Sequence, residues 1–270
     1  MRIALIDSGL GLLSTAAALR AARPDADLIL SMDPQHMPWG PRSPEEITRR
    51  ALAGARAALA TEQGSHGVDA LVVACNSASV HALPTLRAHL EPTVPVVGTV
   101  PAIKPAADGG GPVAIWATPA TTDSPYQRDL IARFARGAQV APVACEGLAG
   151  AVESGDTAAV AAAIATAAER TPPDVAAVVL GCTHYDLVSE PITAALGEGV
   201  ELFTAATAVA AQTLRRLQVQ RRPDASPTGR LTVLSSGHPG ELPAPALTYP
   251  AGAFLAQTPR AHPAPVYGPR

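Results

Sequence analysis

The stretch DALVVACNSASV at residues 69–80 joins an apolar run to a cysteine, an asparagine and small hydroxyl residues. A second stretch, VAAVVLGCTHYD at residues 175–186, repeats this plan with an apolar run followed by glycine, cysteine, threonine and histidine. Short continuous apolar runs with polar ends are typical of strands buried on both faces of a parallel sheet. The chain therefore carries a cysteine to the end of a buried strand twice, at Cys75 and again at Cys182.

Segments with strand and helix character alternate along the chain. Residues 43–63 predict a helix, because Ser43 can cap the first turn and Glu45 and Glu46 lie where the helix dipole favours acids. A single helix is also expected over residues 78–90. Strands separated by helices predict parallel sheets with both faces covered. The expected strands include residues 2–7, 26–33, 70–75, 112–118, 138–145 and 175–182.

A stretch rich in glycine and proline, residues 98–112, separates two similar series of strands and helices. We therefore expect an α/β fold of two similar parallel-sheet domains that face each other across a cleft. The first domain would comprise residues 1–98 plus 207–270, because the strand-like segment at 230–236 is expected to return to it. The second domain would comprise residues 99–206.

The composition excludes several classes of protein. The net charge is -3 and no run of lysine or arginine occurs, so nucleic acid is not an expected partner. No stretch approaches the roughly 18 uncharged apolar residues of a membrane span. Asp7 interrupts the apolar N-terminal run and no signal-peptide cleavage site follows, so we expect a cytoplasmic protein. Three cysteines in such a chain argue against a disulfide framework.

The two strand-end cysteines suggest proton transfer. Open α/β sheets bind ligands just outside the carboxyl ends of their strands. Two domains facing each other would then hold Cys75 and Cys182 on opposite sides of one ligand. That arrangement suits a two-base racemase, because a thiol has a pKa of about 8.5 and modest tuning gives a thiolate at neutral pH. One thiolate would remove a proton from Cα, and the opposite thiol would return one to the other face.

The end of the first expected strand adds a polar turn. Asp7 and Ser8 are followed by Gly9 and Gly11, which free the backbone to turn and to present N–H groups. Such groups bind anions, so a carboxylate is a suitable ligand for this turn.

Six motifs occur in order between residues 2 and 217. They are DSG at 7–9, PWG at 38–40, ACNSAS at 74–79, ATPATTDSPY at 117–126, VESG at 152–155 and GCTHY at 181–185. Together they resemble the cofactor-independent Asp/Glu racemase family. Five positions depart from the usual pattern of that family, and two of these departures bear on the substrate: Leu12 stands in place of a glycine and Trp39 in place of a tyrosine. The other three are Ser77, Glu146 and Asp186.

The resemblance implies a role for each matching residue. Cys75 and Cys182 would be the acid/base pair, assisted by Asp7 and His184, with Glu153 supporting His184. The resemblance also implies that the enzyme needs no cofactor and no metal, forms a homodimer, and interconverts L- and D-glutamate for peptidoglycan synthesis. The substrate-binding residues would be Asp7, Ser8, Trp39, Gly40, Asn76, Ser77, Thr121, Thr183 and His184.

Other interpretations remain open at the level of sequence. With Leu12 and Trp39 in the motifs, the substrate could instead be aspartate or another acid, or the chain could be a silent ligand-binding or regulatory paralogue. Catalysis with pyridoxal phosphate is disfavoured, because Lys104 is the single lysine and lies between Ile103 and Pro105. Cys145 is expected to be a core residue.

Overall fold

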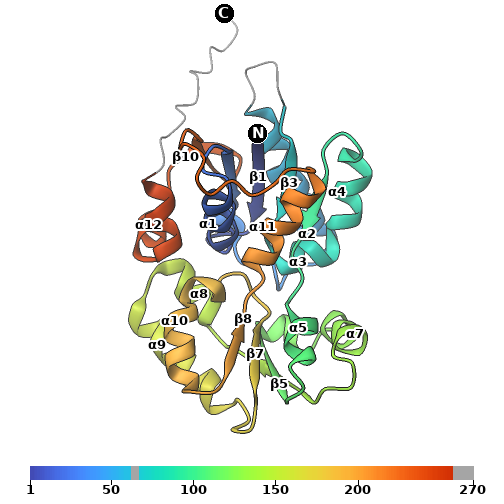
Figure 1. The fold of residues 1–270 in the computed structure, drawn as a ribbon, viewed down its shortest axis with the longest axis vertical. Coiled ribbons are helices and arrows are strands. Elements are labelled where there is room, and N and C mark those ends of the chain that lie inside the picture. The colour runs from blue at the N-terminus through green and yellow to red at the C-terminus, as the bar shows by residue number, and fades with distance from the viewer. Residues whose placement is uncertain (62–66, 258–270) are drawn as a thin grey trace, which may run out of the picture.

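The structure is a computed structural model that describes residues 1–61 and 67–257. It contains two sheets, each covered by helices, which lie one above the other along the long axis of the molecule (Figure 1). We call each sheet with the helices packed on it a lobe. The expected α/β class with two parallel sheets is confirmed.

The first sheet has six strands in the order β10-β9-β2-β1-β3-β4, and the second has four in the order β6-β5-β7-β8. All neighbours pair in parallel except β9 and β10. The strands are β1 (Arg2–Asp7), β2 (Asp27–Met32), β3 (Ala70–Val73), β4 (Val96–Gly98), β5 (Val113–Ala117), β6 (Val140–Ala144), β7 (Ala177–Leu180), β8 (Glu201–Phe203), β9 (Leu231–Ser235) and β10 (His238–Gly240).

Helices connect the strands and cover both faces of each sheet. They are α1 (Leu12–Ala22), α2 (Pro44–Ala60), α3 (Asn76–His81), α4 (Leu83–Leu90), α5 (Ile103–Asp108), α6 (Pro119–Thr122), α7 (Pro125–Phe134), α8 (Leu148–Ser154), α9 (Thr157–Glu169), α10 (Ser189–Leu196), α11 (Ala206–Arg216) and α12 (Pro250–Ala256). Three short 3-10 turns are η1 (Pro34–His36), η2 (Tyr185–Val188) and η3 (Ala244–Thr248). None of the helices in the described ranges has both the length and the apolar character that a membrane span requires.

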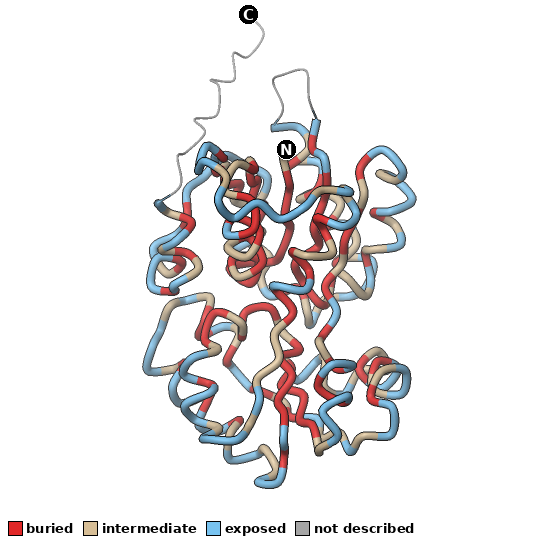
Figure 2. Tube along the Cα trace, viewed as in Figure 1, coloured by how far each residue is buried: buried red, intermediate tan, exposed pale blue. Residues whose placement is uncertain are grey.

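The central strand β1 shows how the first lobe is packed. Successive side chains point to opposite faces of a sheet, so Ile3 and Leu5 join the core shared with α1, α11 and α12. Ala4 and Ile6 join the core under α2, α3 and α4 on the other face. Strands β1, β2, β3, β5 and β7 are accordingly buried along almost their whole length, whereas β6, β8 and β10 at the sheet edges and the outer helix faces are more exposed (Figure 2).

The second lobe follows the same rule and shares one core with the first. Trp116 and Leu180 point toward α8, α9 and α10, in the cluster that also holds Leu5 and Leu10 of the first lobe. Val179 points to the other face, toward α5 and α7. Because one apolar cluster runs through both lobes, the contact between them is part of the folded core.

The strand order fixes where a ligand can bind. In the first sheet β1 lies between β2 and β3, so the connections that follow β1 and β3 run to opposite sides. In the second sheet β5 lies between β6 and β7 with the same consequence. Such topological switch points leave a crevice beyond the carboxyl ends of the strands. Asp7 and Cys75 lie at the first switch point, and Cys182 at the second.

The predicted helices differ from the observed ones in detail. The helix expected over residues 43–63 begins at Pro44, with the Ser43 side chain accepting from the Glu46 N–H, and ends at Ala60. Residues 62 and 63 lie outside the described residues. The single helix expected over 78–90 is wrong, because two short helices meet at Ala82, ahead of a proline that lacks the N–H a continuous helix would need.

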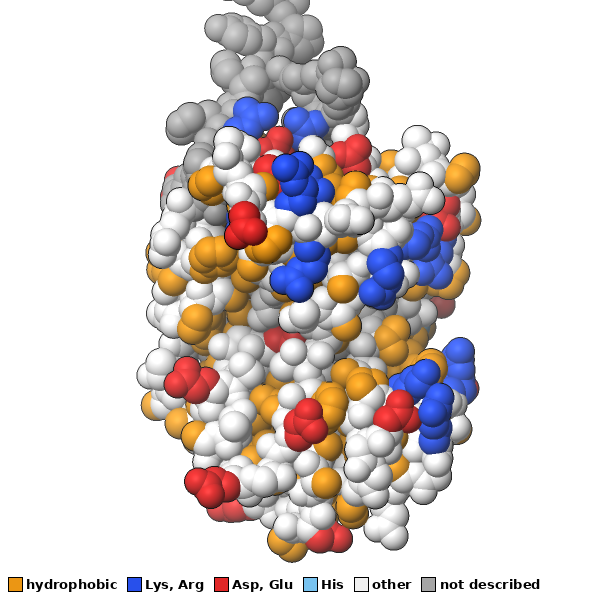
Figure 3. Space-filling view, in the orientation of Figure 1, with side chains coloured by type: hydrophobic (Ala, Val, Ile, Leu, Met, Phe, Trp, Pro, Cys, Tyr) orange, Lys and Arg blue, Asp and Glu red, His pale blue; other side chains and the backbone are white. Residues whose placement is uncertain are grey.

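The C-terminal part of the chain adds a strand to the sheet of the first lobe. Strand β9 pairs with β2, and the buried Arg20 donates to the Arg230 carbonyl at 3.0 Å. The sequence did not indicate β10, η3 or α12. On the face drawn in Figure 3, basic side chains lie over the upper lobe and on one side of the lower lobe, among acidic and neutral side chains.

Candidate active site

A cavity of about 400 Å³ lies beyond the carboxyl ends of β1, β3, β5 and β7, between the two lobes. All the site residues predicted from sequence line it, except Glu153. The lining residues that were predicted are Asp7, Ser8, Trp39, Gly40, Cys75, Asn76, Ser77, Thr121, Cys182, Thr183 and His184.

Cys75 and Asp7 form the half of the site that belongs to the first lobe. Their strands are neighbours, and the Ala74 N–H donates to the Ile6 carbonyl at 2.9 Å, which keeps the two strand ends side by side. The Cys75 thiol and the Asp7 carboxyl are close enough to influence each other's pKa. Burial raises the pKa of Asp7 to about 6. Burial and the Asp7 charge also raise the pKa of Cys75, so its thiol form is favoured.

Cys182 and His184 form the other half, at the end of β7. The Cys182 Sγ lies 4.0 Å from His184 Nδ1, and His184 Nε2 lies 2.9 Å from Glu153 Oε2. Burial lowers the pKa of His184, but hydrogen bonds with Cys182 and Glu153 and the nearby negative charges outweigh it and raise this pKa well above its ordinary value. The imidazole is therefore held in its charged form beside the sulfur.

Three hydrogen bonds cross between the halves. The Thr183 hydroxyl donates to Asp7 Oδ2 at 3.2 Å, and Asn76 Nδ2 donates to the Gly181 carbonyl at 2.8 Å. Glu153 Oε2 also accepts from the Leu10 N–H at 2.7 Å. These bonds tie the strand-end loops of the two lobes together around the cavity.

The two glycines of the first turn are required by close packing. A Cβ on Gly9 would overlap the Glu153 carboxylate. A Cβ on Gly11 would overlap Asp7 and Thr183 and would lie 2.8 Å from His184 Nδ1. The sequence suggested that these glycines present N–H groups to a ligand. The structure adds that the absence of a Cβ leaves room for groups of both halves of the site.

The polar groups that line the cavity suit a small charged ligand. Among the described residues no lysine or arginine lines the cavity, and Lys104 is exposed on α5. Asn76 is buried, and its Oδ1 has no hydrogen-bond partner within the described part of the chain. That oxygen is free to accept from an ammonium group. In the same ranges no group of three or more His, Cys, Asp or Glu could hold a metal.

Several lining residues were not predicted. Thr118 follows β5 and Cys145 follows β6, so their positions at strand ends could have indicated them. Cys145 is buried in the core as expected, with a pKa raised to about 12 by burial, and it also reaches the cavity. The others have no polar signature: Met37, Pro38, Pro41, Pro119, Ala120, Gly147, Ala149, Gly150 and Gly181.

Two of the departures from the family pattern, Leu12 and Trp39, have different surroundings. Leu12 is fully buried at the start of α1 and packs in the main core, away from the cavity lining. Trp39 is 1% exposed and lines the cavity, and its indole N–H donates to Asp33 at 3.1 Å. Of the two, only Trp39 can act directly on the choice of ligand.

The fold and the site together define a two-lobed α/β protein whose ligand cavity is lined by Cys75 of the first lobe and by Cys145 and Cys182 of the second. The sequence matches the Asp/Glu/Hydantoin racemase family over residues 12–213, and the chain belongs to this family. It is an isomerase of the amino-acid racemase type.

Individual relatives agree with this assignment. The chain is 37% identical over 247 residues to the glutamate racemase of Roseiflexus sp. (strain RS-1), which covers 88% of each protein. It is 36% identical over 271 residues to the glutamate racemase of Deinococcus radiodurans, covering 95% of this chain and 89% of that protein. A crystal structure of Escherichia coli glutamate racemase in complex with L-glutamate and the activator UDP-MurNAc-ala superposes with a TM-score of 0.77 at 30% identity, covering 94% of this chain and 92% of that one.

Proposed function

We propose that this protein interconverts L- and D-glutamate with Cys75 and Cys182 as the two acid/base groups. The observation that carries the proposal is that the two cysteines reach one cavity from the strand ends of opposite lobes. A planar carbanion held between them has a thiol on each face. Glutamate is the substrate that the names of both relatives carry, and L-glutamate is bound in the similar crystal structure.

Each turnover moves one proton off Cα and another onto it. In one direction the Cys182 thiolate takes the Cα proton, and the electron pair stays on Cα, delocalised into the α-carboxylate. The Cys75 thiol then gives its proton to the opposite face of Cα. The enzyme is left with a Cys182 thiol and a Cys75 thiolate, which is the state that accepts the other enantiomer.

The neighbours of the two sulfurs differ in charge. The charged His184, which Glu153 keeps protonated, lies 4.0 Å from the Cys182 sulfur. The charge of Asp7 raises the pKa of Cys75 and so favours its thiol form. We therefore propose that His184 assists proton transfer at Cys182 and that Asp7 assists it at Cys75.

The cavity lining supplies the remaining catalytic effect. The Cα proton is a much weaker acid than a thiol, so most of the barrier must be lowered by stabilising the carbanion and by positioning the substrate. Asn76 Oδ1 is a candidate acceptor for the substrate ammonium. The candidate donors to the carboxylates are the Gly40 N–H and the hydroxyls of Ser77 and Thr121. The hydroxyls of Ser8 and Thr183 also line the cavity, but their single protons are donated to Asp7.

Proton NMR in D₂O tests the proposal. The protein, without added cofactor, is incubated with each enantiomer of glutamate and of aspartate. We expect the α-proton signal of glutamate to disappear while the optical rotation moves to zero. The variants Cys75→Ala and Cys182→Ala should each slow racemisation by about 10³-fold, whereas the matched variant Cys145→Ala should keep it.

The other outcomes separate the alternatives. Exchange with aspartate alone would identify a racemase for a different acid. Binding of glutamate without exchange of the α-proton would indicate a silent ligand-binding paralogue. No exchange with any of the four amino acids would overturn the proposal.

We also propose the biological setting and the assembly that the family resemblance suggests. The enzyme would supply D-glutamate for peptidoglycan in the cytoplasm. It would also act as a homodimer, and light scattering would then measure twice the mass of one chain. The domains would be residues 1–98 with 207–270, and residues 99–206. The pairing of β9 with β2 in the first sheet supports this division.

A further inference from the structure

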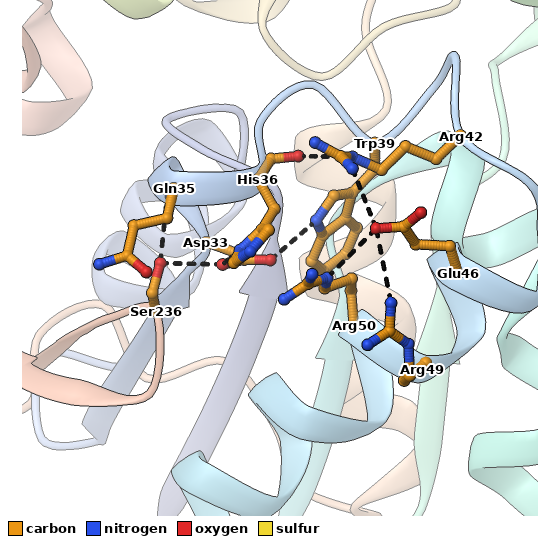
Figure 4. A network of polar contacts seen from close by, with 9 residues as sticks. All are labelled: Asp33, Gln35, His36, Trp39, Arg42, Glu46, Arg49, Arg50 and Ser236. Carbon is orange, nitrogen blue, oxygen red and sulfur yellow. Dashed lines mark hydrogen bonds and ion pairs between the residues drawn. The ribbon is translucent and has the colours of Figure 1, made fainter.

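A polar network holds the segment between β2 and α2, which forms one wall of the cavity. We call residues 33–42 the wall segment. Five consecutive residues of this segment, 37–41, line the cavity. Figure 4 shows the network around Asp33, which stands at the beginning of the segment and points toward Trp39, His36 and Ser236.

Asp33 accepts three side-chain hydrogen bonds. Its Oδ1 accepts from Ser236 Oγ at 2.8 Å and lies 2.9 Å from His36 Nδ1. Its Oδ2 accepts from the Trp39 indole N–H at 3.1 Å. Burial raises the pKa of Asp33, but the hydrogen bonds from His36, Ser236 and Trp39 outweigh it and lower this pKa below its ordinary value. The carboxylate is therefore charged at neutral pH and bonded on both oxygens.

The indole of Trp39 depends on this acceptor. The side chain is 1% exposed and packs against the core under α2, where the N–H cannot reach water. A buried donor that loses its acceptor carries the full cost of its lost hydration. Because the bond to Asp33 satisfies the N–H, it also fixes which part of the ring faces the cavity.

The far end of the wall segment is anchored separately. Arg42 Nε donates to the His36 carbonyl at 2.8 Å, and its guanidinium pairs with Glu46 of α2 at 2.9 Å (Figure 4). At the near end the Asp33 N–H donates to the carbonyl of Ser8, which lines the cavity. The wall segment is thus tied both to the first turn of the site and to α2.

Ser236 brings the C-terminal part of the chain into the network. It lies in the turn between β9 and β10 with a left-handed backbone (φ 46°), and its N–H donates to the Met32 carbonyl at 2.7 Å. Its hydroxyl bonds Asp33 and accepts from the Gln35 N–H at 3.4 Å. A residue far along the chain therefore supports the first residue of the wall segment.

We propose that Asp33 is a positioning residue for the substrate, because it fixes Trp39 and the wall segment against the cavity, and that Ser236 supports it from the C-terminal turn. Neither residue lines the cavity, so both would act through Trp39 and its neighbours. The inference rests on the proposed racemase function for its kinetic readout. Its second readout, the environment of Trp39, does not depend on that function.

Steady-state kinetics of Asp33 variants provide the first test. In Asp33→Ala the indole N–H has no acceptor, and we expect KM for glutamate to rise about tenfold while kcat changes less than about threefold. Asp33→Asn should be close to the wild type, because its amide oxygen can accept from Trp39 while its amide N–H donates to Ser236 or neutral His36. Asp25→Ala is the matched control: it removes a carboxylate paired with Arg23 in the same lobe, outside the cavity lining.

A double-mutant cycle and the C-terminal turn sharpen this test. Adding Trp39→Phe to Asp33→Ala removes the unpaired N–H, so the combined change in KM should be smaller than the product of the two single changes. Ser236→Ala and Ser236→Gly should raise KM by the same few-fold factor. Both variants remove the hydroxyl, but only glycine adopts the left-handed backbone of residue 236 without strain. Equal KM values in the two variants would therefore assign the effect to the loss of the hydroxyl.

Fluorescence supplies the second readout. The chain has two tryptophans, so Trp39 is the single one in a Trp116→Phe background. In that background Asp33→Ala should shift the emission to longer wavelength, and Asp33→Asn should not. Unchanged KM and emission in Asp33→Ala would overturn the proposal, and so would an equal loss in Asp33→Ala and Asp33→Asn. If Asp33→Ala shifts the emission as expected but the wild type does not racemise glutamate, the proposed function alone is wrong.

Discussion

Cys75 and Cys182 hold equivalent positions in the two lobes, yet their neighbours differ in chemical kind. The thiol of Cys75 meets a buried carboxyl, Asp7, whose pKa burial raises to about 6. The sulfur of Cys182 meets His184, whose charge Glu153 maintains. A carboxylate favours a protonated neighbour and an imidazolium favours an ionised one. Two similar strand ends therefore place the same side chain beside neighbours of opposite charge.

The bonds between the halves explain how this difference is kept. Thr183 of the second lobe donates to Asp7 of the first, and Glu153 of the second lobe accepts from Leu10 of the first. Each half thus contains a contact supplied by the other lobe. The charged neighbours of the two sulfurs are therefore held in place only when the two lobes are packed together.

The strongest way to break both halves at once is Gly11→Ala. The added Cβ would overlap Asp7 and Thr183 and crowd His184. We expect racemisation to fall by about 10³-fold, because a displacement of this size misaligns both acid/base groups. The measurement is initial rate by polarimetry, with circular dichroism to verify folding. Gly67→Ala is the control, because its Cβ meets nothing within 4 Å; equal rates in both variants would contradict the close packing at Gly11.

The Cys182 half can be weakened alone by His184→Asn. This change removes the positive charge beside the sulfur, and kcat should fall by about 10²-fold. With Cα-deuterated substrates, the primary isotope effect should rise for one enantiomer only, the one whose proton Cys182 removes. An isotope effect that rises equally for both enantiomers would show that His184 serves both sulfurs.

Asp7→Asn should weaken the opposite half by about 30-fold, within the usual range for a proton-transfer assistant. Its isotope effect should rise for the enantiomer that His184→Asn leaves unchanged. If both variants affect the same enantiomer, the division of the site into two halves is wrong.

Asp7→Asn also has an expected effect on stability. The folded pKa of about 6 exceeds the ordinary 3.8, so between these values the folded state binds more protons and stability falls as pH rises. Above pH 6 the ionised Asp7 costs at most about 3 kcal/mol. The asparagine variant should therefore have a higher Tm than the wild type at pH 8 and no such advantage at pH 4, as thermal unfolding at the two pH values would report.

The smallest expected effect is that of Glu153→Gln. The amide oxygen can still accept from the Leu10 N–H, but the negative charge that helps to raise the pKa of His184 is lost. We expect kcat at neutral pH to fall three- to tenfold, roughly, with the alkaline limb of the pH–rate profile moving to lower pH. An unchanged alkaline limb would mean that Glu153 does not govern the charge of His184.

Part of the cavity lining could be expected from the sequence. Asp7, Cys75 and Cys182 were expected at strand ends, because the carboxyl ends of parallel strands meet at one edge, whereas Trp39 and Thr121 were suggested by the family resemblance alone. Thr118 and Cys145 obey the same rule, but a threonine before a proline and a cysteine in an apolar segment carry little signal of their own. The break at Ala82 was missed, although Pro84 lies two residues on, because local helix propensity is similar on both sides of it.

The sequence by itself determined the alternation of strands and helices, the two strand-end cysteines and their polar neighbours, because these depend on local periodicity and residue type. The family resemblance suggested that Glu153 supports His184, but the sequence could not show that the same carboxylate also bonds Leu10, or that Ser236 reaches Asp33. Those contacts join residues more than 30 positions apart, and they form only once both sheets and the C-terminal return have packed. Burial, which raises the pKa of Asp7 and of Cys75, is likewise a property of the packed lobes, since solvent is excluded only after the whole chain has folded.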